Sequence, residues 1–136
     1  MEYLFEIEGA NFSVAGNASS TIKRALKQRN VDPAKIKRIV VALFEAEINV
    51  VAHADHGTIR VLIEENQVQM FVKDYGPGIE DVDLAMSEGY STASNSVREM
   101  GFGAGMGLPN IKRNADVFEI ESIKGLGTNA HIIIYL

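Results

Sequence analysis

One helical turn separates two oxygen-bearing side chains near the middle of the chain, Glu45 and Asn49. They interrupt residues 39–52 (IVVALFEAEINVVA), a nearly all-apolar segment that predicts a largely buried helix. At about 100° per residue, both side chains share one side of this helix with small alanines, which would leave room for a ligand. Two oxygen ligands one turn apart suit a hard cation such as Mg²⁺, and a carboxylate there could act as a general base. Alternatively, these groups cap a neighbouring element or face solvent.

Two other polar residues of the same segment carry weaker signals. Glu47 projects toward the bulky, apolar side of the helix, which favours a structural or interface-facing role over a chemical one. His53 continues the small, polar side, where it either touches a ligand or hydrogen-bonds a neighbouring carbonyl, and we expect the second. Without cysteine or a helical His pair, the sequence does not predict a zinc site.

An aspartate followed by alternating glycines closes a predicted strand, in the order Asp74-Tyr75-Gly76-Pro77-Gly78. A carboxylate at a strand end can accept hydrogen bonds from a planar group such as an exocyclic amine. The glycines would let a ligand ring approach the backbone closely. An ordinary turn that contains Asp is the alternative.

A second glycine set fills alternate positions of residues 101–107 and leads directly into a predicted helix. Exposed backbone amides and a helix N-terminus together form an anion site, which phosphate usually occupies. The strict alternation matches neither the P-loop nor the dinucleotide-binding glycine pattern, and a flexible linker is the alternative. Lys112 and Arg113 either help to hold phosphate or simply suit the last turns of the helix.

The third glycine set, Gly125-Leu126-Gly127-Thr128, lies between the last two predicted strands. As a bare turn it needs no function. If its strand neighbours the strand that ends at Asp74, the Thr128 hydroxyl would share a water molecule with that carboxylate.

The elements that must position these residues are indicated by local patterns. Asn17, Ser19 and Ser20 offer N-caps for a helix to about residue 29, and Asp32-Pro33 starts a second helix that runs to about 53. We expect a third helix over 108–114 and no regular element between 79 and about 104. The predicted strands cover 2–8, 58–65, 67–73, 117–122 and 128–135, with a hairpin turn at Asn66. This order predicts an α+β, two-layer sandwich with a mixed, mainly antiparallel sheet and helices on one face.

Composition narrows the class of protein. The chain has 136 residues, 46% of them hydrophobic, which predicts one domain with a real core. A net charge of −5 argues against a general nucleic-acid surface. The longest apolar run, residues 39–44, is too short to span a membrane, and the first residues do not form a signal peptide. We therefore expect a soluble, cytoplasmic protein; the sequence leaves open whether it forms a homodimer.

Four motifs in order resemble the GHKL superfamily of ATPases, which have the histidine kinase-like Bergerat fold. They are Glu45-x-x-x-Asn49, Asp74-x-Gly76-x-Gly78, Gly103-x-Gly105-x-Gly107 and Gly125-x-Gly127-Thr128. Within that superfamily the chain is similar to bacterial partner-switching anti-sigma factors and switch-protein serine kinases, with the RsbT-like branch nearest. Residues 93–100, in the predicted lid, form a longer segment than these relatives lead us to expect.

The resemblance implies a domain that binds Mg²⁺-ATP under a mobile lid of about residues 79–104. Glu45 would be the catalytic base, Asn49 would hold Mg²⁺, and Asp74 would recognise the adenine amino group with Thr128 behind it. The remaining nucleotide-binding positions would be Gly76, Gly78, Gly103, Gly105, Met106, Gly107 and Leu108. Arg98 of the lid would reach either phosphate or a partner.

Three functions are consistent with these features. The first is a serine/threonine protein kinase that acts on a small antagonist protein. The second is a nucleotide-dependent module that sequesters a sigma factor or another regulator without significant turnover. The third is a detached histidine kinase catalytic domain, which would need a phospho-acceptor helix from a partner. We expect ATP, Mg²⁺ and a protein partner in each case, and neither nucleic acid nor a membrane.

Overall fold

The computed structural model describes residues 1–76 and 107–136. In these residues five strands and three α-helices follow in the order β1-α1-α2-β2-β3-α5-β4-β5, as the sequence predicts, with a short 3₁₀-helix, η1, at Phe12–Val14. The strands are β1 (Glu2–Glu8), β2 (His56–Ile63), β3 (Gln67–Asp74), β4 (Val117–Ile123) and β5 (Gly127–Tyr135). The helices are α1 (Asn17–Gln28), α2 (Pro33–His53) and α5 (Gly107–Asn114). No helix in these two stretches is long and apolar enough to cross a membrane.

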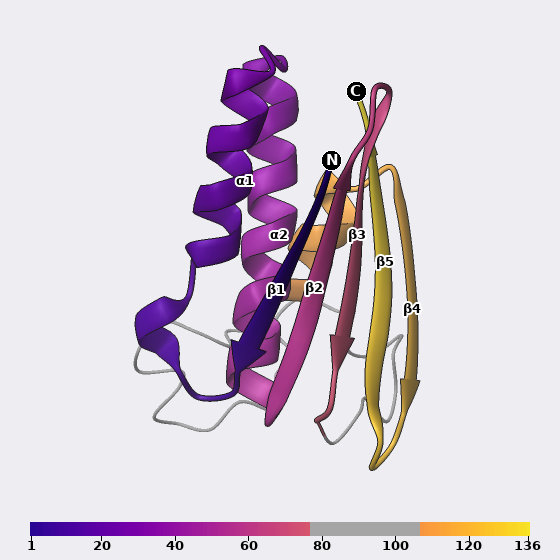
Figure 1. Ribbon diagram of the computed structural model, residues 1–136. Coiled ribbons are helices and arrows are strands. Elements are labelled where there is room, and N and C mark those ends of the chain that lie inside the picture. Colours follow the sequence, from indigo (N-terminus) through magenta and orange to yellow (C-terminus); the bar gives the residue numbers. More distant parts are fainter. Residues whose placement is uncertain (77–106) are drawn as a thin grey trace.

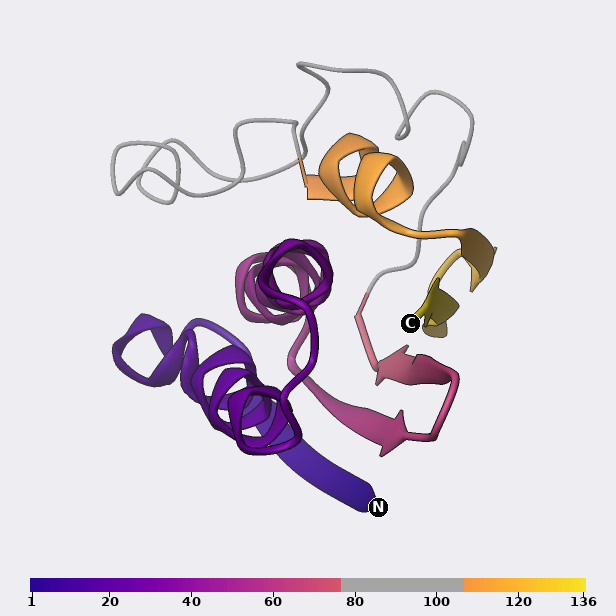
Figure 2. The ribbon, with the colours of Figure 1, turned by 90° about the horizontal axis from the view of Figure 1, so that it is seen from above.

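The five strands form one sheet in the order β1-β2-β3-β5-β4, with the helices on one face (Figures 1 and 2). Every pairing among them is antiparallel, so the described sheet is fully antiparallel rather than mixed. Inward-facing residues alternate along the central strands, as a half-covered sheet requires, and examples are Ile59, Met70 and Ile132. The predicted α+β sandwich is confirmed.

Helix α2 lies at the centre of the helical layer, between α1 and α5 and against the sheet. Its start is confirmed: the Asp32 side chain accepts a hydrogen bond from the Ala34 backbone N–H at 2.9 Å, and Pro33 occupies the first helical position. Ile39, Leu43 and Val50 are fully buried. This helix therefore connects all the elements that carry candidate site residues.

Strand β2 starts two residues earlier than the sequence indicates. His56 and Gly57, which we expected in the connection, pair with Glu8 and Ile7 of β1. A Cβ atom on Gly57 would lie 2.7 Å from the Lys73 carbonyl oxygen and 2.8 Å from Val50 Cγ1. Gly57 is thus required by close packing inside the sheet rather than by a turn.

The N-terminus of α1 is capped differently from the prediction. The N-cap residue is Gly16, with φ of +98°, and it provides no side-chain cap. The Glu47 carboxylate of α2 instead accepts hydrogen bonds from the backbone N–H groups of Gly16 (2.9 Å), Ala18 (3.3 Å) and Ser19 (3.1 Å). The expectation that Asn17, Ser19 or Ser20 caps α1 is wrong, because a carboxylate distant in sequence meets the first-turn donors. Glu47 thus has a structural role.

We predict that Glu47→Ala lowers the free energy of unfolding by about 2–4 kcal/mol, because it leaves two buried and one partly buried N–H donor without an acceptor. Glu47→Gln keeps one acceptor oxygen and should cost about half as much. Urea unfolding monitored by circular dichroism measures both values. Glu121→Gln on the exposed surface of β4 is the control. Equal stability of Glu47→Ala and this control would contradict the capping role.

Candidate functional site

Seven of the predicted site residues lie in the described part of the chain: Glu45, Asn49, Asp74, Gly76, Gly107, Leu108 and Thr128. Gly78, Gly103, Gly105 and Met106 lie outside it, as does the proposed lid over 79–104. The seven site residues that the structure describes lie at two places along α2. One is its contact with the start of α5, and the other is its C-terminal end beside β3 and β5.

Glu45 reaches the first turn of α5. Asn110 Nδ2 donates to Glu45 Oε1 at 3.5 Å, and a Cβ atom on Gly107 would lie 3.4 Å from Glu45 Oε2. The half-buried carboxylate therefore lies where the glycine-rich segment enters the helix. The positive end of the α5 dipole and a negative side chain meet at this point.

Asn110 is a site residue that sequence reasoning missed. Its amide nitrogen donates to Glu45, and its Oδ1 accepts from Arg113 Nη2 at 2.6 Å. These polar contacts link the Glu45 carboxylate to Asn110 and, through it, to Arg113. Its position one helical turn after Gly107 was the available signal.

The small side of α2 serves mainly to pack a helix. Ala42 and Ala46 are buried in the same core cluster as Leu108 and Ile111 of α5, and the two helices are in contact. Small side chains allow helices to approach closely, so the room that the alanines leave is largely used by α5. Glu45 and Asn49 remain half-buried on this side.

Asp74 lies at the end of β3, where β2, β3 and β5 meet in register with Gly57 and Thr128 as its neighbours. Its Oδ1 accepts backbone N–H donors from Gly76 at 3.1 Å and from Thr128 at 3.2 Å. Strands β3 and β5 are neighbours, which was the condition for the Thr128 hydroxyl to share a water molecule with Asp74. The direct contact comes from the Thr128 backbone, whereas the Thr128 hydroxyl lies 2.9 Å from Ser122 Oγ.

Electrostatics at this end of α2 involve Asp74 and His53. Burial raises the pKa of Asp74 above its ordinary value, against the opposing effects of the two backbone hydrogen bonds and of His53. Burial lowers the pKa of His53, and the Asp74 charge acts in the opposite direction. His53 is thus held mainly neutral beside a carboxylate that is costly to ionise.

Two glycines of the site are required by protein backbone rather than by a ligand. A Cβ atom on Gly76 would lie 2.9 Å from the His53 carbonyl oxygen at the end of α2. Gly127 has φ of +138°, and a Cβ atom there would overlap the Asp74 carbonyl oxygen. Both glycines therefore let the chain close around Asp74.

Comparison with known proteins shows the family of this chain. Residues 10–134 match the family described as "Histidine kinase-like ATPase domain". The chain belongs to this family. The match spans the four motifs, including the two carried by Glu45 and Asp74.

Relatives in this family include regulatory proteins of bacteria. The chain is 32% identical over 103 residues to "Serine/threonine-protein kinase RsbT" of Bacillus subtilis, which covers 73% of this chain and 71% of that protein. It is 32% identical to "Anti-sigma F factor" of Caldanaerobacter subterraneus, over the whole of this chain and 97% of that one.

Solved structures agree with the fold. The SiaB-SiaC complex of Pseudomonas aeruginosa contains a chain that matches with a TM-score of 0.64 and 12% identity, covering 97% of this chain and 88% of that one. The mycobacterial sensor histidine kinase MprB matches with a TM-score of 0.56 and 15% identity, covering 99% and 97%. The ATPase fold of this family is therefore present.

We predict that Gly127→Ala lowers the free energy of unfolding by about 3 kcal/mol or more, because the new methyl group overlaps the Asp74 carbonyl. Gly125→Ala is the matched control, since Gly125 also has a positive φ (+83°) but nothing lies within 4 Å of its Cβ position. That substitution should cost about 1 kcal/mol. Equal losses for the two variants, measured by urea unfolding, would contradict the close approach at Asp74.

We predict that Asp74→Asn is at least as stable as the natural protein at pH 7. The amide oxygen can accept the same two N–H donors, and the variant avoids the cost of ionising a buried carboxyl. Since the folded-state pKa of Asp74 lies above its unfolded value, the folded protein binds the extra proton as pH falls through that window. The free energy of unfolding of the natural protein should therefore rise relative to that of the variant as the pH falls from 7 to 4. Urea unfolding at both pH values measures the difference, and a variant clearly less stable at pH 7 would refute it.

Proposed function

We propose that this protein is a Mg²⁺-ATP-dependent serine/threonine protein kinase that acts on a small antagonist protein in a cytoplasmic partner-switching pathway. The observation that carries the proposal is the Glu45 carboxylate, held by Asn110 at the first turn of α5. The relative named as the serine/threonine-protein kinase RsbT supports the reaction class. Belonging to the histidine kinase-like ATPase family supports ATP as the phosphate donor.

The environment of Asp74 fits an adenine amino group. Both hydrogen bonds from the described residues go to its Oδ1, so Oδ2 can accept a hydrogen bond from an exocyclic amine. The β-register and the close approach at Gly127 fix the direction of this carboxyl group. Gly76 and Thr128 would act through the backbone donors that they present to Asp74.

The α2–α5 contact fits a phosphate-bound cation. Asn49 places an amide oxygen one helical turn after Glu45, a donor type that Mg²⁺ accepts in proteins. The backbone N–H groups of Gly107 and Leu108, at the start of α5, would bind phosphate oxygens together with those of Gly103, Gly105 and Met106. When bound, Mg²⁺-ATP supplies the transferable phosphoryl group and neutralises its charge.

Glu45 would act as the general base. Its carboxylate would accept the proton of an attacking serine or threonine hydroxyl, and Asn110 would keep it oriented while that proton moves. Catalysis would rest on positioning, because phosphoryl transfer needs little covalent chemistry from the protein.

Gly78 is another proposed nucleotide-binding position, which we assign with Gly76 to the adenine.

A second candidate is a nucleotide-dependent module that binds a sigma factor or another regulator without significant turnover. The relatives named "Anti-sigma F factor" favour it, one of them aligned over the whole of this chain. Both candidates use the same nucleotide site, and they differ in whether phosphate is transferred once the protein partner has bound.

Phosphate transfer by the natural protein separates the two candidates, and Glu45→Gln tests the proposed base. We expect this variant to bind ATP with unchanged affinity but to transfer phosphate to the antagonist about 10²–10⁴-fold more slowly, because a general base is lost. The measurement is transfer from γ-labelled ATP to a cognate antagonist protein, with Glu121→Gln as the control. Transfer by Glu45→Gln at the natural rate would exclude Glu45 as the base. A stable regulator complex with no phosphorylated product from the natural protein would instead favour the binding module.

A further inference from the structure

Positive charge is concentrated in one short part of this acidic chain. Residues 21–38 hold seven of the 13 Lys and Arg residues and one of the 18 Asp and Glu residues, a formal net charge of +6. The other residues, six basic and 17 acidic, sum to −11. The basic stretch covers most of α1, the connection and the start of α2.

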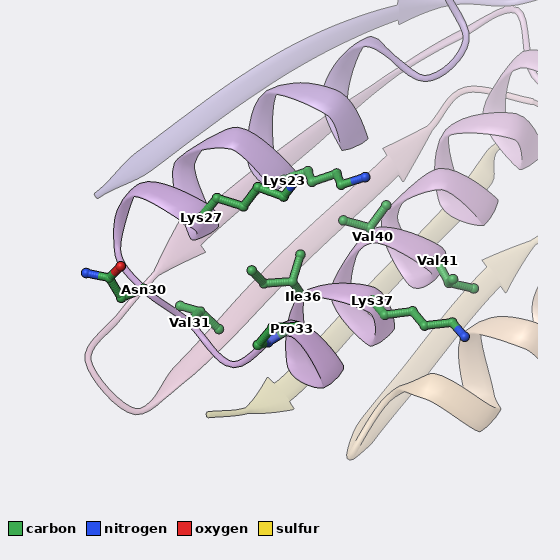
Figure 3. Close-up of a pocket in the computed structure, with 9 residues that line it drawn as sticks. All are labelled: Lys23, Lys27, Asn30, Val31, Pro33, Ile36, Lys37, Val40 and Val41. Atoms are coloured by element: carbon green, nitrogen blue, oxygen red, sulfur yellow. The ribbon is translucent and has the colours of Figure 1, made fainter.

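A pocket of about 630 Å³ lies between α1 and α2 within and just beyond this stretch (Figure 3). Its apolar wall is formed by Val31, Pro33, Ile36, Val40 and Val41. Helical spacing explains the wall on α2, because residues three, four and seven apart share one face. The volume falls within the range of sites that accept a bulky apolar group.

Three exposed lysines line the same pocket. Lys23 and Lys27 lie one turn apart on α1, and Lys37 comes from α2 (Figure 3). Neither of the two ion pairs among the described residues involves them. Their positive charges are thus available to an acidic group at a pocket whose wall is largely apolar.

Helix stability does not account for this charge on α2. The first turn of α2 contains no acidic residue but does contain Lys35, and Lys37 follows two residues later. Cations in the first turn of a helix oppose its dipole, so Lys35 costs stability, and Lys37, just beyond that turn, gains none from the dipole. Lys27, in the last turn of α1, is the one lysine of the pocket whose position suits the dipole.

We propose that this pocket docks an acidic, amphipathic segment of the protein partner, with an apolar side chain in the pocket and carboxylates on Lys23, Lys27 and Lys37. The inference rests on the proposed function in that it assumes a protein partner. An apolar centre with a charged rim is the usual make-up of a protein interface. None of the residues that line the pocket is aromatic, so it offers no stacking surface for nucleic-acid bases.

The docking pocket is separate from the nucleotide site. Lys37 and Asn49 are twelve residues apart on one helix, which corresponds to about 18 Å along its axis. Glu45, eight residues after Lys37, lies about 12 Å further along the helix axis and contacts α5. Substitutions in the pocket therefore leave the groups proposed to bind ATP in place.

The test uses a fluorescent peptide of about 15 residues, with Leu at helical spacing and Glu elsewhere, and the full chain at physiological salt. We expect saturable binding by fluorescence anisotropy, and at least about tenfold weaker binding to Lys23→Glu/Lys37→Glu. Arg24→Glu/Arg29→Glu is the control, with the same charge change on exposed residues outside the pocket. It should weaken binding less than about threefold. Thermal unfolding checks each variant, and Lys23→Ala/Lys37→Ala replaces the charge reversal if that variant does not fold.

Two outcomes would overturn the proposal. One is equal weakening by the two pairs of substitutions, or equal binding of a peptide with Gln in place of Glu. The other is binding to phosphatidylglycerol vesicles, lost in Lys23→Glu/Lys37→Glu, without binding of the peptide, which would assign the pocket to a membrane surface. ATP titration of the same samples keeps the two proposals distinct. Absence of ATP binding by the natural protein would refute the nucleotide site, whereas the peptide titration tests the pocket alone.

Discussion

The burial of α2 is the constraint on which the rest of the structure depends. A helix packed against two other helices and a sheet cannot leave its polar groups without partners, since each would cost free energy. Glu47 binds the N-terminus of α1, and Glu45 contacts Asn110 of α5. Arg38 donates to the Asn114 carbonyl at the end of α5 and pairs with Asp116 before β4. Glu47 thus attaches α1, while Glu45 and Arg38 attach the two ends of α5, and these directional contacts fix an orientation that apolar packing alone leaves less well defined.

At the C-terminal end of α2, burial of the Asp74 carboxyl lowers the stability of the fold rather than adding to it. The backbone of β5 and the end of α2 approach the residues around Asp74 so closely that Gly76 and Gly127 cannot carry a side chain without displacement. The same closeness buries the Asp74 carboxyl and raises its pKa. A neutral residue would be easier to bury here, and the nucleotide-binding role proposed for Asp74 would account for a carboxylate at this position.

Local signals predicted much of the fold, and contacts between distant residues explain the differences. Asp32-Pro33 marks the start of α2 because a cap and a proline act within one turn of chain. The cap of α1 could not be read in this way, since Glu47 is 28 to 31 residues from the N–H groups that it accepts. Gly57 resembles a turn residue in sequence, and only the packing of Val50 and β3 against it shows why it stands inside a strand.

The candidate site was predicted to a similar extent. The motifs identified Glu45 and Asp74, because their spacing from Asn49 and from the glycines is visible in the sequence. Asn110 was missed because its meaning depends on the α2–α5 contact, which brings together residues 65 positions apart. The net charge of −5 also hid a separation of charge, with +6 in residues 21–38 and −11 elsewhere. Lys37 of the pocket and Asn49 are about 18 Å apart along α2, more than the Debye length of about 8 Å at physiological salt. A nucleotide and an acidic protein segment would therefore be largely screened from each other, so the two proposed sites would be compatible in a chain of negative net charge.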